Sequence, residues 1–116
     1  MLWMRKNHNA RLERAMVYKV IFTESSEKDR DGIALYFSGT DSSTKGLEYF
    51  FDELDALVAR LSNEPLMYEK VHEKRLAERG YRRAFFGNYV AVCCIYDNIV
   101  EISRIFHQKQ DYAKLL

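Results

Sequence analysis

Four residues near the C-terminus carry side chains suited to acid-base chemistry on a charged substrate: Arg104, His107, Lys109 and Tyr112. A histidine titrates near neutral pH and could donate or accept a proton. Arg104 or Lys109 could hold a phosphate, and Tyr112 could stack on a base. The alternative, which we favour, is a structural histidine at a strand end that pairs with Asp111, because a net charge of only +1 attracts anions weakly.

An antiparallel hairpin is expected just before this cluster. Residues 81–86 and 89–96 are aromatic and β-branched runs, and they flank Gly87-Asn88, a pair that accepts the positive φ angles of a two-residue turn. The second run is nearly all apolar, which predicts a central strand with little exposure on either face.

A third strand is expected at residues 99–106, after a turn at Asp97-Asn98 in which Asn tolerates left-handed φ. The three runs then form an antiparallel meander. The alternation of apolar and polar residues breaks from Arg104 onward, which predicts a bulge or strand end there. Arg82 and Arg83 should point to opposite faces of the first meander strand, so at most one of them can join the cluster. We expect the fold to bring one of the two near it.

The first half of the chain predicts one strand and one helix. Residues 17–22 alternate as a strand does. Thr23, Ser25 and Ser26 can cap the helix that follows, which should run to about Ser38 and end at Gly39. Glu24, Glu27 and Asp29 suit the positive end of its dipole. We expect three of its side chains to turn inward: Ile33, Tyr36 and Phe37.

A second, longer helix gives the clearest periodic signal, and Asn63 and Pro65 should stop it. Its apolar stripe comprises Leu47, Phe50, Phe51, Leu54, Leu57, Val58 and Leu61. The connector at residues 65–79 has a helical tendency. We expect Met67, Tyr68 and Val71 to pack under the sheet edge, and His72 to sit in solvent.

These elements predict an α+β fold: an N-terminal strand, a two-helix hairpin that covers one sheet face, and a three-stranded antiparallel meander. The first strand should join the sheet at an edge or beside the last meander strand. Residues 1–15 read as a basic, poorly ordered extension, and residues 16–116 as the single domain.

Charge is unevenly distributed along the chain. Residues 24–64 hold ten acids against four bases, whereas residues 65–116 hold nine bases against six acids. An anionic partner should therefore approach the half that contains the meander.

The two cysteines, Cys93 and Cys94, are neighbours in the predicted central strand and point to opposite faces, so they cannot pair with each other. They read as two small hydrophobic residues in a reduced cytoplasm. No spacing in the sequence indicates a metal or a cofactor, and no apolar run approaches the roughly 20 residues that span a bilayer.

Four segments, in this order and spacing, resemble the RelE/ParE toxin superfamily, the toxin half of bacterial type II toxin-antitoxin modules. They are YKVIFTESSEKD at 18–29, LSNEPLMY at 61–68, RLAERGYRRAFFGNY at 75–89 and VEISRIFHQKQDY at 100–112. The resemblance implies a cytoplasmic protein, a cognate antitoxin that wraps around it, and no sequence-specific DNA binding by the toxin alone.

The superfamily has two mechanisms, and they need different residues. RelE-like members cut mRNA on the ribosome, whereas ParE-like members poison DNA gyrase. The ribonucleases place a cation directly after the tyrosine of the second meander strand, where this chain has Val90. GYRRAFFGNY and the I-x-R-I-x-H ending look closer to the ParE-like branch. The favoured expectation is therefore a toxin that binds a protein target such as gyrase.

Two alternatives stay open. One is a ribosome-dependent mRNA endonuclease that uses the residues of the C-terminal cluster, and the other is a non-toxic interaction domain that keeps the fold. Whether the chain is an enzyme is thus undecided by the sequence. The residues expected to bind the target or the antitoxin are Arg82, Arg83, Tyr89, Arg104 and His107.

Overall fold

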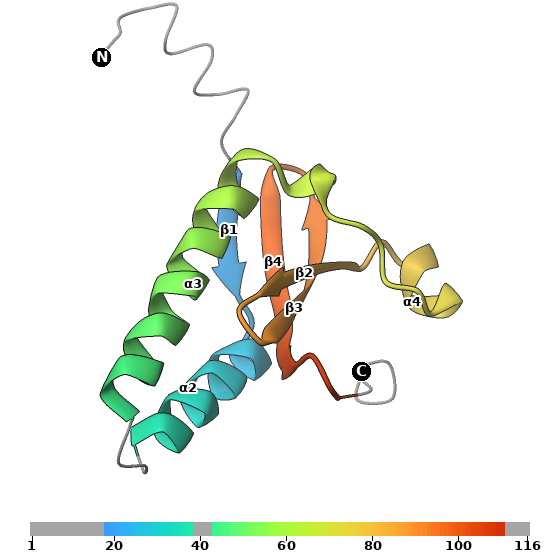
Figure 1. Ribbon diagram of the computed structural model, residues 1–116. Coiled ribbons are helices and arrows are strands. Elements are labelled where there is room, and N and C mark those ends of the chain that lie inside the picture. The colour runs from blue at the N-terminus through green and yellow to red at the C-terminus, as the bar shows by residue number, and fades with distance from the viewer. Residues whose placement is uncertain (1–17, 39–42, 111–116) are drawn as a thin grey trace, which may run out of the picture.

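The structure is a computed structural model that describes residues 18–38 and 43–110. The expected extension at residues 1–15 and the expected helix end at Gly39 lie outside the described residues. Figure 1 shows a twisted sheet with two long helices on one side and a short helix on the other. This is the α+β arrangement that the sequence predicts.

The sheet has four strands in the order β1-β4-β3-β2. β1 (Lys19–Phe22) pairs in parallel with β4 (Ile99–His107), while β2 (Arg82–Phe86) and β3 (Tyr89–Tyr96) complete the antiparallel meander. β3 lies between two neighbours, as its apolar sequence predicts. β1 is an edge strand beside the last strand, so its predicted place is also confirmed.

The turns and the bulge follow local backbone preferences. Gly87 begins the β2–β3 turn with φ +54°. In the β3–β4 turn it is Asp97, with φ +53°, that takes the left-handed conformation, so the expectation that Asn98 does so is wrong. Opposite β3, Val92 faces Arg104 and Cys93 faces Ile102, which leaves Ser103 as the extra residue of a bulge. The irregularity predicted near Arg104 is confirmed.

The two long helices are α2 (Glu24–Ser38) and α3 (Ser43–Asn63). Thr23 caps α2: the backbone N–H of Ser26 donates to its Oγ1 at 3.1 Å. The same hydroxyl donates to the carbonyl oxygen of Ser103 at 2.9 Å. The start of α2 is thereby fixed against the bulge of β4.

The core has two parts, one on each face of the sheet. The larger part lies under α2 and α3, and its buried residues include Phe50, Leu54, Leu57, Leu61, Phe86, Val100 and Ile102. On the opposite face, the connector and the short helix α4 (Lys74–Glu78) contribute Val71 and Leu76 to a smaller cluster. Both faces of the central strands are therefore covered.

Three side chains that the sequence places inside lie at the surface. Tyr36 is 70% exposed, Met67 is 58% exposed, and Phe51 is 36% exposed. The connector bends into a short 3-10 turn, η1 (Pro65–Met67), which directs Met67 outward while Tyr68 packs on the core. Periodicity identifies a helix face, but not how far the neighbouring element extends over it.

Candidate binding groove between α2 and β4

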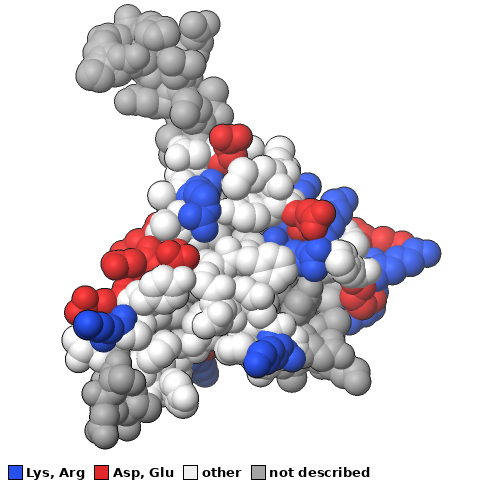
Figure 2. Space-filling view, viewed as in Figure 1, with Lys and Arg blue, Asp and Glu red and all other residues white. Residues whose placement is uncertain are grey.

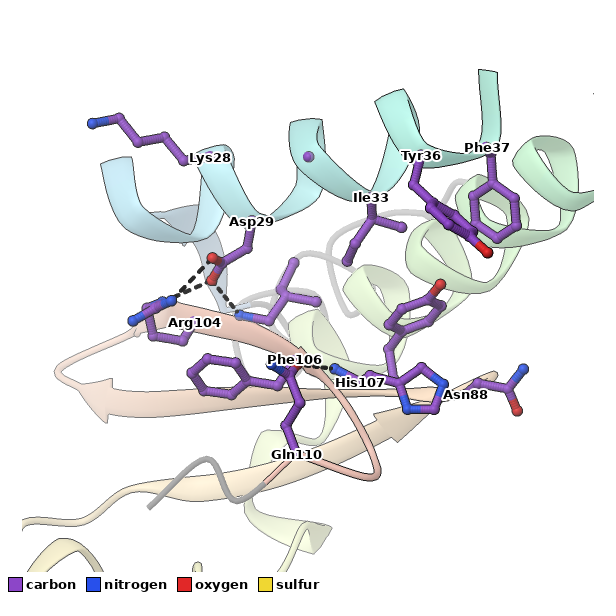
Figure 3. Close-up of a pocket in the computed structure, with 13 residues that line it drawn as sticks. Lys28, Asp29, Ile33, Tyr36, Phe37, Asn88, Arg104, Phe106, His107 and Gln110 are labelled. Carbon is purple, nitrogen blue, oxygen red and sulfur yellow. Dashed lines mark hydrogen bonds and ion pairs between the residues drawn. The ribbon is translucent and has the colours of Figure 1, made fainter. Parts of the chain in front are cut away.

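A groove of about 800 Å³ runs between α2 and the end of β4. We call it the α2–β4 groove. Figure 3 shows Asp29, Ile33 and Phe37 descending from α2 toward the strand, with Arg104 and His107 below them. Its lining residues are Lys28, Asp29, Gly32, Ile33, Tyr36, Phe37, Asn88, Tyr89, Arg104, Ile105, Phe106, His107 and Gln110.

Helical spacing and unequal strand lengths create this groove. Asp29, Ile33 and Phe37 recur every four residues and so share one face of α2. β1 ends at Phe22, opposite Ile102, so within the described sheet β4 runs on without a strand on that edge. α2 crosses beside this extension, and the side chains between them line the groove.

The charged end of the groove is an ion pair that joins helix to strand. Arg104 Nε donates to Asp29 Oδ2 at 2.8 Å, and Nη2 donates to Oδ1 at 3.1 Å. The backbone N–H of Ile105 also donates to Oδ2, at 2.9 Å. The hydrogen bond from Arg104 to Asp29 raises the pKa of the guanidinium above its ordinary value. Asp29 thus takes the place of a strand partner on the open edge of β4.

The other end of the groove is aromatic. The rings of Tyr89 and His107 meet edge to face, with centroids 5.6 Å apart, and Phe50 packs on Tyr89 from below at 5.2 Å. Burial, with a smaller contribution from Tyr36, raises the pKa of the Tyr89 hydroxyl. Tyr89 is therefore a neutral hydrogen-bonding group at physiological pH.

His107 is held by the turn that follows β4. Its Nδ1 accepts from the backbone N–H of Lys109 at 3.2 Å, and the backbone N–H of His107 donates to Gln110 Oε1 at 2.9 Å. A neutral imidazole whose Nδ1 accepts carries its proton on Nε2. The expected partner of His107, Asp111, and the fourth member of the predicted cluster, Tyr112, lie outside the described residues. Lys109 is exposed and does not line the groove.

Arg82 and Arg83 lie elsewhere, so the expectation that one of them joins this cluster is wrong. Arg82 Nη1 donates to the carbonyl oxygen of Tyr68 at 2.6 Å, whereas Arg83 Nη2 donates to Glu69 Oε1 at 2.8 Å and to His72. Both arginines fasten the connector to β2. His72 is exposed, as predicted.

Sequence reasoning misses the helix side of the groove. It treats Asp29 only as a charge near a helix start, whereas the partner of Asp29, Arg104, lies 75 positions away. It also places Tyr36 in the core. The sequence does contain a usable signal: Asp29 lies one turn before Ile33, on the helix face that Phe37 continues, and a carboxylate on an inward face needs a cation or an N–H group.

The chemistry of the groove suits binding more than proton transfer. Its strongest cation, Arg104, is already neutralised by Asp29, and the wall beyond is apolar and aromatic. Figure 2 shows a broad face without charged side chains between the acids over α3 and the mixed charges around α4. Among the described residues, no three histidine, cysteine or acidic side chains gather as a metal site would require. In that part of the chain, no helix has the length and apolar character to cross a bilayer.

Comparisons with known proteins place these observations in a family. A family model described as "ParE toxin of type II toxin-antitoxin system, parDE" matches residues 20–112. A solved chain of the "Chromosomal ParDE TA system from P. aeruginosa" has a similar fold, with a TM-score of 0.63 and 15% sequence identity over 78% of this chain and 96% of that chain. At that identity, the likeness shows the fold alone. A search of curated proteins gives no match.

Proposed function

Because the chain belongs to the ParE toxin family of type II toxin-antitoxin systems, we propose that it acts by binding a protein target such as DNA gyrase. A cognate antitoxin neutralises it by covering the α2–β4 groove. The observation that carries this proposal is the Asp29–Arg104 pair, which has both guanidinium donors on one carboxylate at 2.8 and 3.1 Å. An arginine engaged in this way has little capacity left for a scissile phosphate.

The groove has the composition of a protein-binding surface. Tyr36 is 70% exposed at its rim, and Ile33, Phe37 and Tyr89 are half-buried along its wall. Aromatic side chains of this kind anchor most protein interfaces, because they bury a large area and lose little conformational freedom. An amphipathic antitoxin segment fits such a groove in the manner of a helix laid into an apolar cleft.

The antitoxin arm of the proposal is tested by comparing two neighbouring residues of α2. Tyr36 lines the groove, whereas Leu35 is 73% exposed and does not. Tyr36→Ala should weaken binding of the antitoxin encoded beside the gene by about tenfold or more, and Leu35→Ala by less than about twofold. Isothermal titration calorimetry on the purified pair measures both. Equal affinities for the two variants would show that the antitoxin binds another surface.

The remaining predicted contact residues divide by position. Tyr89, Arg104 and His107 line the groove, so we assign them to the antitoxin interface. Arg82 and Arg83 lie on β2, and we assign them to the target. Arg82→Ala should therefore reduce toxicity while leaving antitoxin affinity unchanged.

A second candidate function rests on His107, whose imidazole borders the groove with Nε2 as the donor of its neutral form. In this alternative the protein cuts ribosome-bound mRNA, with His107 as the acid or base. It predicts that His107→Ala relieves growth arrest without loss of folding. A fully toxic His107→Ala variant, together with a harmless Arg82→Ala variant, contradicts it. If the wild-type chain expresses well and causes no growth defect, a non-toxic interaction domain is the better description.

A further inference from the structure

A second hollow, of about 220 Å³, opens where α3 meets the β2–β3 turn. We call it the Glu53 hollow. It adjoins the α2–β4 groove, because Phe37, Asn88 and Tyr89 line both. Its lining residues are Phe37, Gly46, Tyr49, Phe50, Glu53, Phe86, Gly87, Asn88 and Tyr89.

Two glycines let the walls of this hollow approach one another. A Cβ on Gly46 would lie 2.8 Å from the ring of Phe37, and a Cβ on Gly87 would lie 3.3 Å from the ring of Tyr49. Gly87 also has φ +54°, which other residues rarely adopt. Phe50 and Phe86, each only 2% exposed, form the floor, and their ring centroids lie 6.0 Å apart.

The hollow combines apolar walls with one carboxylate. Among the described residues that line it, Glu53 alone is charged. Its Cγ lies 3.8 Å from the position of a Cβ on Gly87, which places the side chain beside the turn. Within the described part of the chain, Glu53 forms no ion pair. A ligand that satisfies both features has an apolar stem and a cationic head.

We infer that the Glu53 hollow receives an arginine side chain from the antitoxin segment that occupies the adjoining groove. The methylene stem of arginine packs on apolar walls, and its guanidinium stacks on rings and binds a carboxylate through two parallel N–H donors. Lysine shares the stem and the charge, but its ammonium is compact and more strongly hydrated. The inference rests on the proposed function for the identity of the partner, and on the hollow itself for the chemistry.

The test uses a small probe, so that it does not depend on the antitoxin. N-acetyl-arginine methylamide is titrated into the purified full chain, with the neutral citrulline counterpart as the control ligand. The backbone N–H resonances of Gly46, Tyr49 and Gly87 report binding by two-dimensional NMR. The arginine probe should produce saturable shifts at these positions, and the citrulline probe should bind about fivefold more weakly or not at all.

Two neighbouring carboxylates of α3 supply the matched variants. Glu53 lines the hollow, whereas Asp52 is exposed and does not. Glu53→Gln should weaken the arginine probe about fivefold, and Asp52→Asn should leave its affinity unchanged. Tyr49→Ala is a second variant that removes a wall, and circular dichroism verifies that each variant is folded.

The outcomes separate this inference from the proposed function. Equal binding of the two probes, no binding of either, or an unchanged affinity in both Glu53→Gln and Tyr49→Ala overturns the inference. Such a result leaves the proposed function standing wherever the antitoxin still responds to Tyr36→Ala. Conversely, the arginine probe could bind selectively while Tyr36→Ala leaves the affinity for the antitoxin unchanged. That result supports an arginine site in the Glu53 hollow and contradicts the assignment of the antitoxin to the α2–β4 groove.

Discussion

Asp29 is the residue on which the geometry of the groove depends. Its carboxylate accepts from Arg104 and from the backbone N–H of Ile105, and its side chain is only 17% exposed. Removing it leaves a half-buried guanidinium and an open strand edge without this partner. The position of α2 against β4 therefore depends on this side chain as well as on apolar contacts.

Asp29→Ala should lower the free energy of unfolding by about 1–2 kcal/mol. Asp31→Ala is the control, because Asp31 is a mostly exposed residue of the same helix that pairs with Arg30 at the surface, and its loss should cost less than about 0.5 kcal/mol. Urea unfolding measures both. Similar values for the two variants would show that the Asp29–Arg104 pair does not hold the helix.

Cys93 provides a prediction about pH. Burial, with a smaller contribution from Cys94, raises the pKa of its thiol from 9.0 to about 12. Between pH 9 and 12 the unfolded chain therefore releases a proton that the folded chain retains. The contribution of this thiol to the free energy of unfolding is fully present below pH 9. It falls as pH rises above 9, by about 1 kcal/mol at pH 10.

The measurement is urea unfolding at pH 8 and pH 10 for the wild type and Cys93→Ala. Between the two pH values, the free energy of unfolding should fall by about 1 kcal/mol more for the wild type than for Cys93→Ala. Cys94→Ala is the comparison, since Cys94 is only half-buried and should change the pH dependence less. A Cys93→Ala variant with the same alkaline loss as the wild type rules out a thiol that ionises only on unfolding.

At the scale of single residues, the sequence predicts types and neighbours better than partners. The cluster of Arg104 and His107 at the end of a strand is present, and the bulge beside it is where alternation breaks. Local patterns indicate that Asp29 needs a partner, but they do not identify Arg104 as that partner, because the two residues lie 75 positions apart. The same limit explains why the sequence places Arg82 or Arg83 near the wrong cluster.

At the scale of elements, glycines on the two long helices predict opposite effects. A methyl group added to Gly32 of α2 would have no atom within 4 Å, while a methyl group on Gly46 of α3 would lie 2.8 Å from the ring of Phe37. Gly32→Ala should raise the free energy of unfolding by about 0.5–1 kcal/mol, because alanine favours the helix. Gly46→Ala should lower it by about 1 kcal/mol, because overpacking outweighs that gain.

Thermal or urea unfolding of the two variants supplies the signs. Destabilisation by Gly32→Ala would mean that α2 is not a regular helix at that position. Stabilisation by Gly46→Ala would mean that Phe37 moves freely, and the shared wall between the groove and the Glu53 hollow would then not be fixed.

Element boundaries and topology follow from the sequence because they depend on local periodicity and turn chemistry. The meander strands, the two helices and the N-terminal strand all lie within a few residues of their predicted positions. The predictions that fail concern which side chains of an element are buried. Tyr36, Phe51 and Met67 are apolar by type, yet their exposure depends on the relative lengths of elements that meet only in the folded chain.

At the scale of the whole molecule, the domain should not require the first fifteen residues. The family model begins at residue 20, and the backbone N–H of Tyr18 donates to the carbonyl oxygen of Ser62 at 2.7 Å. A chain that starts at Met16 should unfold within about 0.5 kcal/mol of the full chain and cause the same growth arrest. Loss of folding in the shorter chain would assign residues 1–15 to the domain.

The two sides of the molecule have separate tasks in this account. The helix side holds the groove and the Glu53 hollow, which we assign to the antitoxin. The opposite side holds the connector, which Arg82 and Arg83 fasten to β2 and which we assign to the target. Neutralisation then requires that an antitoxin bound on one side block the approach of the target on the other.

The most direct test is a supercoiling assay with purified DNA gyrase and the purified chain, with the antitoxin added in increasing amounts. We predict that the chain inhibits supercoiling and that the antitoxin restores it, at a higher antitoxin concentration for Tyr36→Ala than for the wild type. Undisturbed supercoiling at saturating protein, with cleavage of ribosome-bound mRNA by the same preparation, would contradict the account.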